Sequence, residues 1–230
     1  MIPHAAELHP IVPEPLPSCQ MPDPEDITEE GFGLFRDTWW IGRVPISEAE
    51  EIVDYEAEVL DALDRAAGDE EDYEAMAVSV ERGESDELSE AQLRSFIDCG
   101  LLKLSPAPDD AVLFGSLEVG IAGLVHALLA LRCATAASCR SHTCERSWSN
   151  CPVVFFAAPD RRVAILAELI RSAGCGLIED RGMLKIYAPS VRETHALAQL
   201  ILKQRSRFTS KPGPKRPQRS RGDQLGLLED

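Results

Sequence analysis

The segment CATAASCRSHTCERSWSNCPVVFFAA, residues 133–158, decides how the second half of this chain folds. Both of its ends are short and apolar, whereas its middle is polar. Short apolar runs bounded by polar residues are typical of buried strands, so we expect strands over residues 133–138 and 152–158. The loop between them carries thiol and imidazole groups, and its potential metal ligands or nucleophiles are Cys139, His142, Cys144 and Cys151.

Helices and a hairpin are expected on either side of this segment. Apolar residues recur at helical spacing before and after it, and Asp180-Arg181-Gly182 is a turn sequence between two further strands. The expected elements are a helix from Ser116 to Leu131, strands over 133–138 and 152–158, a helix over 160–173, strands over 177–179 and 183–187, and a helix over 190–202. This order predicts an α+β fold, in which helices cover a mostly antiparallel sheet.

The first half of the chain has a different character. Residues 1–118 hold 30 acidic and 6 basic side chains, and the whole chain has a net charge of −16. Capping boxes that begin at Ser47 and Ser89 predict helices within this half. We therefore expect an acidic helical unit over residues 27–112, followed by the α+β domain over residues 113–204.

Three titratable residues on the expected helices have a simple interpretation. Carboxylates on an amphipathic helix usually form a solvated face, so Glu56 is expected on the exterior of the first helix. His126 lies beside an apolar stripe and His195 lies near a helix start. We expect both histidines at the surface or its boundary, without a role as ligands.

The two termini are expected to be disordered. Residues 1–26 contain seven prolines, a density that disfavours helices and sheets. Residues 205–230 show no apolar period, and residues 203–222 hold eight basic and no acidic side chains. The sequence thus predicts a proline-rich arm at the N-terminus and a basic tail at the C-terminus.

The cysteines and the apolar runs bear on the compartment. The chain has seven cysteines, an odd number. The first residues lack basic side chains and include Pro3 and Pro10, so we expect no signal peptide. The longest apolar run, residues 121–131, is too short to span a bilayer. These observations predict a cytoplasmic protein with no membrane segment, whose cysteines are thiols or metal ligands.

Zinc is one interpretation of the loop. If the flanking strands pair, Cys139 would approach Cys151, and Cys139, His142, Cys144 and Cys151 would offer three thiolates and one imidazole to a tetrahedral ion. The single residue between His142 and Cys144 is a tighter spacing than such sites usually have. Two alternatives remain open: Cys139 could be a nucleophile with His142 as its base, or the thiols could simply be free.

The same loop resembles a known motif. Ser138-Cys139-Arg140-Ser141-His142, ahead of the Pro-Val-Val-Phe-Phe run, is similar to the Ser-Cys-x-Gly-His motif of the wybutosine-synthesis tRNA methyltransferase family, with Ser141 in place of the glycine. The resemblance covers about residues 116–203 and implies the fold of that family. The family's activity would imply methyl transfer from S-adenosylmethionine to a modified tRNA base. The chain has no Gly-x-Gly-x-x-Gly fingerprint that would independently support a nucleotide cofactor.

The C-terminal residues carry a separate motif. Gln224-Leu225-Gly226-Leu227-Leu228 resembles the short peptides by which bacterial replication and repair proteins dock on the sliding clamp. The residues expected to contact the clamp are Gln224, Leu225, Leu227 and Leu228. A basic tether precedes the motif, and a flexible tether raises the local concentration of an end peptide near its partner. The tether residues expected to contact nucleic-acid phosphates are Arg216, Arg219 and Arg221.

These patterns predict an accessory or binding module that acts around nucleic acid, with Cys139 and His142 in its functional loop. The alternative is an enzyme that uses this loop, either zinc-dependent or related to RNA-modifying methyltransferases. Metal content separates the main interpretations of the loop, because a structural site retains about one equivalent of zinc through purification.

Overall fold

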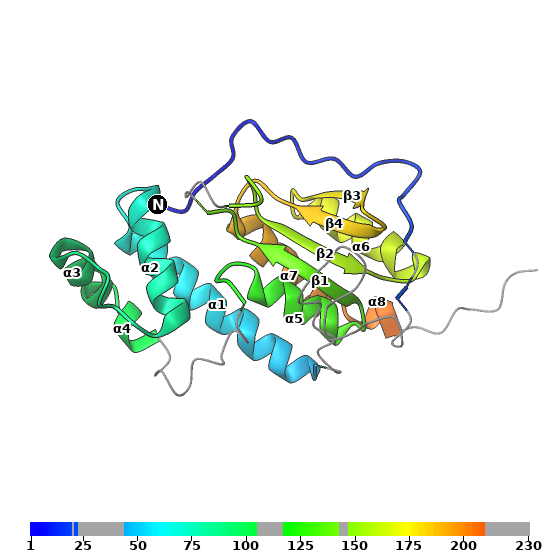
Figure 1. Ribbon diagram of the computed structural model, residues 1–230. Coiled ribbons are helices and arrows are strands. Elements are labelled where there is room, and N and C mark those ends of the chain that lie inside the picture. The colour runs from blue at the N-terminus through cyan, green and yellow to red at the C-terminus, as the bar shows by residue number, and fades with distance from the viewer. Residues whose placement is uncertain (20, 23–43, 105–116, 143–146, 210–230) are drawn as a thin grey trace, which may run out of the picture.

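The computed structural model describes residues 1–19, 21–22, 44–104, 117–142 and 147–209, and its fold is α+β, as predicted (Figure 1). The helices are α1 (Ile46–Ala66), α2 (Glu70–Arg82), α3 (Glu90–Asp98), α4 (Leu101–Leu104), α5 (Ala122–Ala130), α6 (Asp160–Ser172), α7 (Val191–Lys203) and α8 (Ser206–Thr209). The strands are β1 (Ala134–Cys139), β2 (Val153–Ala157), β3 (Gly176–Asp180) and β4 (Met183–Tyr187). From α5 to α7 the order of the elements is the predicted one.

The four strands form one antiparallel sheet in the order β1-β2-β4-β3. Strands β1 and β2 pair, which is the condition that the zinc interpretation required, and Cys139 lies opposite Val153 in their register. The predicted hairpin joins β3 to β4 through Arg181 and Gly182, whose φ angles are 58° and 84°. Two successive positive φ angles are typical of the type I′ turn, which matches the twist of a two-residue hairpin.

One face of the sheet packs on helices. Side chains from β2 and β4, such as Phe156 and Leu184, are fully buried in a core that they share with α5, α6 and α7. Burial of a side chain of this size contributes about 1.5–3 kcal/mol to folding. Helix α1 crosses the outer side of α5 and α7, and its residues Ala49 and Val53 belong to the same core. The acidic helical unit is therefore joined to the α+β domain through α1.

The N-terminal segment covers the other face of the sheet. Leu8, Cys19 and Met21 pack against a second apolar cluster that includes Phe155 and Met183. The segment also passes the edge strand β3, where Ile11 accepts a hydrogen bond from the backbone of Leu177 at 2.9 Å (Figure 1). Residues 1–19 contain no helix or strand, as their prolines predict. Their contacts with the sheet are an addition that the sequence did not indicate.

Helices α2, α3 and α4 lie at one end of α1 (Figure 1). The predicted capping box of α3 is confirmed, because Ser89 and Gln92 exchange both hydrogen bonds. The capping box predicted at Ser47 is wrong. Helix α1 begins at Ile46 after Pro45, and no side chain caps it. Pro45 is the N-cap in place of Ser47, so the helix starts two residues earlier than predicted.

Helix α5, in contrast to α1, begins later than predicted, at Ala122. Gly120 has a φ of 88°, which a right-handed helix cannot include, and the polypeptide before it is an irregular loop. Ser116, the predicted cap, lies outside the described residues. This loop, residues 117–121, brings Glu118 toward the end of β1.

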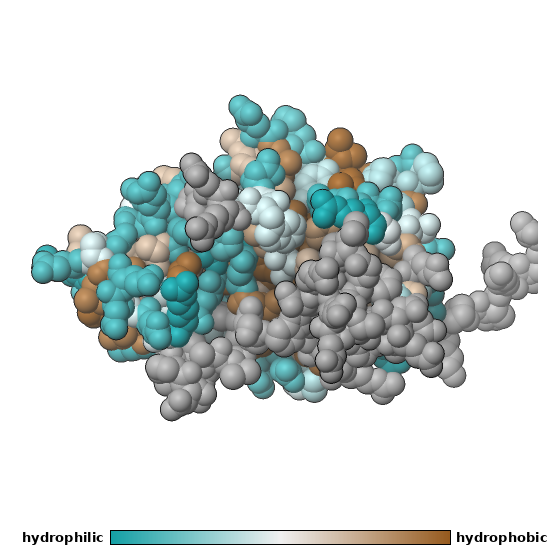
Figure 2. Space-filling model, in the orientation of Figure 1, coloured by the Kyte–Doolittle hydropathy of each residue, from teal (hydrophilic) through white to brown (hydrophobic). Residues whose placement is uncertain are grey.

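The expectation of disorder from residue 205 onward is wrong for residues 205–209, and residues 210–230 lie outside the described residues. Residues 206–209 form the short helix α8, and Phe208 packs against the main core. Figure 2 shows hydrophilic residues over much of the face around α2 and α3, with hydrophobic residues among them. The latter agree with the exposure of Ile97 and Leu102 at this end. In the described part of the chain, none of the helices combines the length and the apolar character needed to cross a membrane.

Candidate functional site

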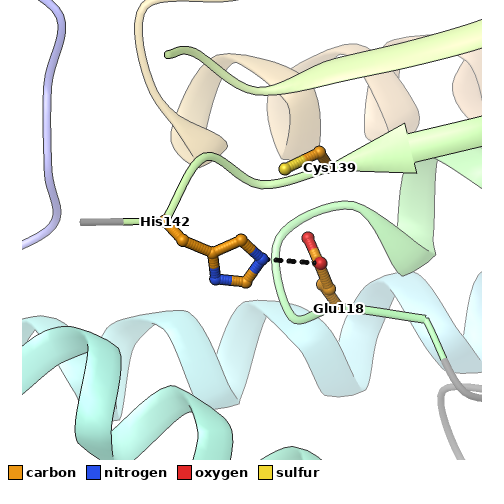
Figure 3. A group of neighbouring side chains, drawn as sticks. All are labelled: Glu118, Cys139 and His142. Carbon is orange, nitrogen blue, oxygen red and sulfur yellow. Dashed lines mark hydrogen bonds and ion pairs between the residues drawn. The ribbon is translucent and has the colours of Figure 1, made fainter. Parts of the chain in front are cut away.

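Three potential metal ligands meet at the end of β1. They are Cys139, the last residue of that strand, His142 in the following loop, and Glu118 in the loop before α5 (Figure 3). The thiol sulfur, one imidazole nitrogen and one carboxylate oxygen of these residues all lie within 4.8 Å of one another. The structure thus brings together the two residues that the sequence singled out, and adds a carboxylate that it did not.

His142 lies between two carboxylates. Its Nδ1 atom is 2.6 Å from Oε1 of Glu74 on α2, and its Nε2 atom is 2.8 Å from Oε1 of Glu118. Partial burial alone lowers the pKa of His142, but the hydrogen bonds to Glu74 and Glu118 outweigh burial and raise it. A carboxylate only accepts hydrogen bonds, so two such contacts favour a ring that is protonated on both nitrogens.

Arg140 forms the floor of the site. Its side chain is fully buried and pairs with Glu74 at 2.9 Å and with Glu81, about two turns further along α2. Burial opposes the charge of Arg140, yet the two carboxylates raise its pKa and keep it cationic. Burial likewise raises the pKa of Glu81, against the effect of Arg140. We take the pair to be ionised, because both partners are in direct contact.

Glu118 is tied to the same network by its second oxygen. The backbone amide of Arg140 donates to Oε2 of Glu118 at 2.5 Å, and the amide of Val119 donates to Glu81 at 2.7 Å. Three carboxylates, those of Glu74, Glu81 and Glu118, therefore face the cations Arg140 and His142. The network holds one negative charge in excess when His142 is protonated, so it favours an additional cation.

The contacts of Cys139 do not favour the alternative in which it is a nucleophile with His142 as its base. Its sulfur accepts a hydrogen bond from the amide of Ser141 at 3.4 Å and lies 3.9 Å from the hydroxyl of Ser147. Burial, followed by the charge of Glu118, raises the pKa of the Cys139 thiol. Both nitrogens of His142 are already bonded to carboxylates. A reactive thiolate needs a lowered pKa and an available base, and this site offers neither.

The ligand group in the structure differs from the four zinc ligands suggested by the sequence. Cys151 is buried at the start of β2 but does not belong to the group of ligand atoms. The register explains this, because Cys139 lies opposite Val153, and Cys151 is two residues beyond that position. Cys144 lies outside the described residues. Among the described residues, the three-ligand group is Glu118, Cys139 and His142.

Ser141 has a φ of 72°, in the left-handed region that favours glycine. It stands where the similar motif has a glycine. A non-glycine residue in this conformation costs about 1–3 kcal/mol, which the surrounding contacts must offset. At this position the backbone turns between Cys139 and His142, whose ligand atoms lie within 4.8 Å of each other.

Glu56 is a second buried carboxylate and corrects the prediction of a solvated residue. It is fully buried on α1, where its Oε1 atom accepts hydrogen bonds from the amides of Gly120 at 2.8 Å and Gly123 at 3.2 Å. Its Oε2 atom is 3.0 Å from Nδ1 of His195 on α7. Glu56 thereby fixes the loop that carries Glu118. The surface positions predicted for His195 and His126 are wrong as well, since both are buried.

Two clefts adjoin His142. The first has a volume of about 270 Å³ and lies between α2, the loop after β1 and the N-terminal arm, where Tyr73, Arg140 and His4 line it. The second has a volume of about 550 Å³ and is lined by Trp148, Arg181 and other residues of the β1–β2 loop and the hairpin. The hydroxyl of Tyr73 is buried and has no hydrogen-bond partner among the described residues.

Sequence reasoning missed Glu118, Glu74 and Glu81. The spacing of Glu70, Glu74, Ala77 and Glu81 places them along one face of α2, which was the available signal. This face meets the end of β1, a long-range contact that the spacing does not indicate. The residues predicted to bind a clamp (Gln224, Leu225, Leu227 and Leu228) and phosphates (Arg216, Arg219 and Arg221) lie outside the described residues.

Comparisons with known proteins gave no relative: no family model, no curated protein and no solved structure matches this chain. The resemblance to the wybutosine-synthesis family therefore remains a prediction from one short motif. The site must be interpreted from its own geometry.

Proposed function

We propose that this protein binds a zinc ion through Glu118, Cys139 and His142, and that the ion acts on a ligand in the adjoining clefts. The observation that supports this most is the grouping of a thiol, an imidazole and a carboxylate within 4.8 Å. Zinc commonly takes these ligand types, and a thiolate argues against magnesium and calcium. Three protein ligands leave a fourth position for water or substrate, which is typical of catalytic zinc sites.

The hydrogen bond from His142 to Glu74 supports the same proposal. A metal-binding histidine usually donates its second ring N–H to a carboxylate, which fixes the tautomer and orients the ring. With the proton on Nδ1 held by Glu74, the Nε2 atom is the one that faces Glu118 and Cys139. The bound ion would replace the Nε2 proton, and it would supply Lewis-acid polarisation and a more acidic bound water.

The prediction of a module that acts around nucleic acid extends this proposal. The clamp-binding peptide and the basic tail would bring the metal site close to DNA or RNA, and no described residue bears on that part. An RNA-modifying methyltransferase is the less favoured alternative. It rests on the motif resemblance and would require an S-adenosylmethionine site.

Metal analysis of untagged protein, purified without added zinc and then dialysed against a trace of zinc, tests the proposal. We expect about one equivalent in the native chain and a large loss in Cys139→Ser and His142→Gln. Cys151→Ser is the matched control, because it removes a buried thiol at the same end of the sheet but outside the ligand group. Thermal denaturation of each variant shows whether its fold is intact.

Cobalt substitution adds a spectroscopic criterion. A sulfur-to-cobalt charge-transfer band should appear in the native chain and in Cys151→Ser, and should be absent in Cys139→Ser. Failure of the native chain to bind zinc or cobalt would refute the proposal. Equal loss of metal in Cys139→Ser and Cys151→Ser would show that the metal is bound by a different set of ligands from Glu118, Cys139 and His142.

A further inference from the structure

We propose that the larger cleft beside His142 binds a nucleotide, whose base stacks on Trp148 and whose phosphate is held by Arg181 and Lys185. The volume of this cleft, about 550 Å³, lies within the range of small-molecule sites. The proposed ligand is a flat aromatic ring that carries an anionic group. A free nucleotide and a nucleotide within a single strand both meet this description.

The aromatic part of the argument rests on Trp148. Its side chain is 58% exposed, whereas Phe155 behind it is buried. The two ring centroids are 6.1 Å apart with an interplanar angle of 38°, so Phe155 supports one part of the indole and leaves the rest accessible. An exposed aromatic ring that is held by a buried one is a suitable surface for base stacking, which tolerates every base.

The anionic part of the argument rests on the hairpin. Arg181 sits in the type I′ turn with 62% of its side chain exposed, and Nζ of Lys185 lies 5.4 Å from the centroid of Phe155. Asp180 pairs with both cations, at 3.7 Å from Arg181 and 3.1 Å from Lys185. At the hairpin side of the cleft, two cations and one carboxylate leave a single positive charge, on a chain whose net charge is −16. A local positive charge on an acidic protein attracts anions to this place.

The position of the cleft beside the metal ligands suits a nucleotide that acts as a substrate. His142, Ser147 and Asn150 line its side toward the metal ligands, so a phosphate group held at the hairpin lies in the same cleft as the site. The role as a substrate rests on the proposed zinc site. The binding itself does not depend on zinc, so each proposal can fail while the other holds.

Calorimetric titration of the full chain with a nucleoside 5′-monophosphate tests the inference, with and without zinc. Stacking contributes about 1–3 kcal/mol per base, so we expect Trp148→Ala to weaken binding by about 5- to 150-fold. Trp148→Phe should retain part of the affinity, because it keeps an aromatic ring. Arg181→Asn removes the charge while suiting the left-handed turn, and should weaken the nucleotide more than the corresponding nucleoside.

A single-stranded oligonucleotide distinguishes the cleft from the basic tail. Substitution of Arg216, Arg219 and Arg221 by Gln should weaken oligonucleotide binding and its salt dependence, but leave the mononucleotide unaffected. Unchanged mononucleotide affinity in Trp148→Ala, with an unchanged melting temperature, would overturn the inference. So would an absence of any mononucleotide binding to the native chain. Oligonucleotide binding that depends only on the tail would likewise assign nucleic-acid contact to the tail and not to the cleft.

Discussion

The Nδ1 atom of His142 lies 2.6 Å from Oε1 of Glu74, although the two residues are 68 positions apart in the chain. The contact joins the acidic helix α2 to the loop after β1. It therefore makes the helical unit part of the candidate metal site, because the orientation of His142 depends on a residue outside the α+β domain.

Glu74→Gln should weaken zinc binding by about 10- to 100-fold, since the amide no longer offers His142 a charged acceptor. Competition with a chromogenic chelator measures the affinity. Glu71→Gln is the control, because Glu71 lies on the exposed side of the same helix. An equal effect of the two substitutions would show that only the overall acidity of α2 matters.

Arg140→Met should destabilise the fold by about 3–5 kcal/mol, because it removes the buried cation that pairs with the carboxylates of Glu74 and Glu81. Addition of Glu81→Gln should restore part of this loss, as it removes one of the uncompensated charges. Urea denaturation gives both values. Arg82→Met is the control: its exposed pair with Glu87 should contribute less than about 1 kcal/mol. A small effect at Arg140 would mean that water enters the site freely.

Gly123→Ala should destabilise the protein by about 1–3 kcal/mol, although alanine favours a helix over glycine by about 1 kcal/mol. The added Cβ would lie 2.4 Å from Oε2 of Glu56 and would displace that buried carboxylate. The same substitution should be less harmful in a Glu56→Asp background, where the carboxylate is shorter. Thermal and urea denaturation of the four proteins give the interaction energy. A gain in stability from Gly123→Ala alone would contradict the observed packing.

Much of the fold follows from local signals, which is why it could be predicted. Short apolar runs bounded by polar residues mark β1 and β2, and the turn at Arg181 and Gly182 sets the hairpin. The site depends on contacts between distant segments. Glu118 lies in a short loop, where no local pattern marks it as a ligand. Cys151 lies two residues beyond Val153, the residue opposite Cys139, and is therefore outside the ligand group. The cost of burying Glu56 is offset by one amide from the loop before α5, one amide from α5 and the imidazole of His195 on α7, which spacing along α1 cannot indicate.

The first residues of the chain should loosen at acidic pH. Asp64 accepts a hydrogen bond from the amide of Ile2 at 3.0 Å and pairs with Arg192 at 2.8 Å. Slight burial raises the pKa of Asp64, but these partners outweigh burial and lower it. A carboxyl group with a lowered pKa in the folded state stabilises that state above its ordinary value, near 3.8, and the contribution is lost as the pH falls through the lowered value. Asp64 is partly exposed, so solvent screening keeps the effect small.

Pepsin cleavage of the segment before Leu8, followed over a series of acidic pH values, measures this loosening. Asp64→Asn should show the same cleavage at neutral pH with a neutral protease. Asp61→Asn should not, because the ion pair of Asp61 within the described part of the chain is with Arg192 and not with the N-terminal segment. Cleavage that is independent of both pH and Asp64 would mean that other contacts hold the segment.

The path of the N-terminal arm has a consequence for synthesis on the ribosome. The backbone amide of Ile11 donates to the hydroxyl of Tyr187, 176 positions later, so the arm around Ile11 can make this contact only after β4 has emerged. We expect the arm of a stalled nascent chain that ends before β4 to be cut readily by a protease, and that of the released protein to resist. Equal resistance in both would show that the arm finds an earlier partner.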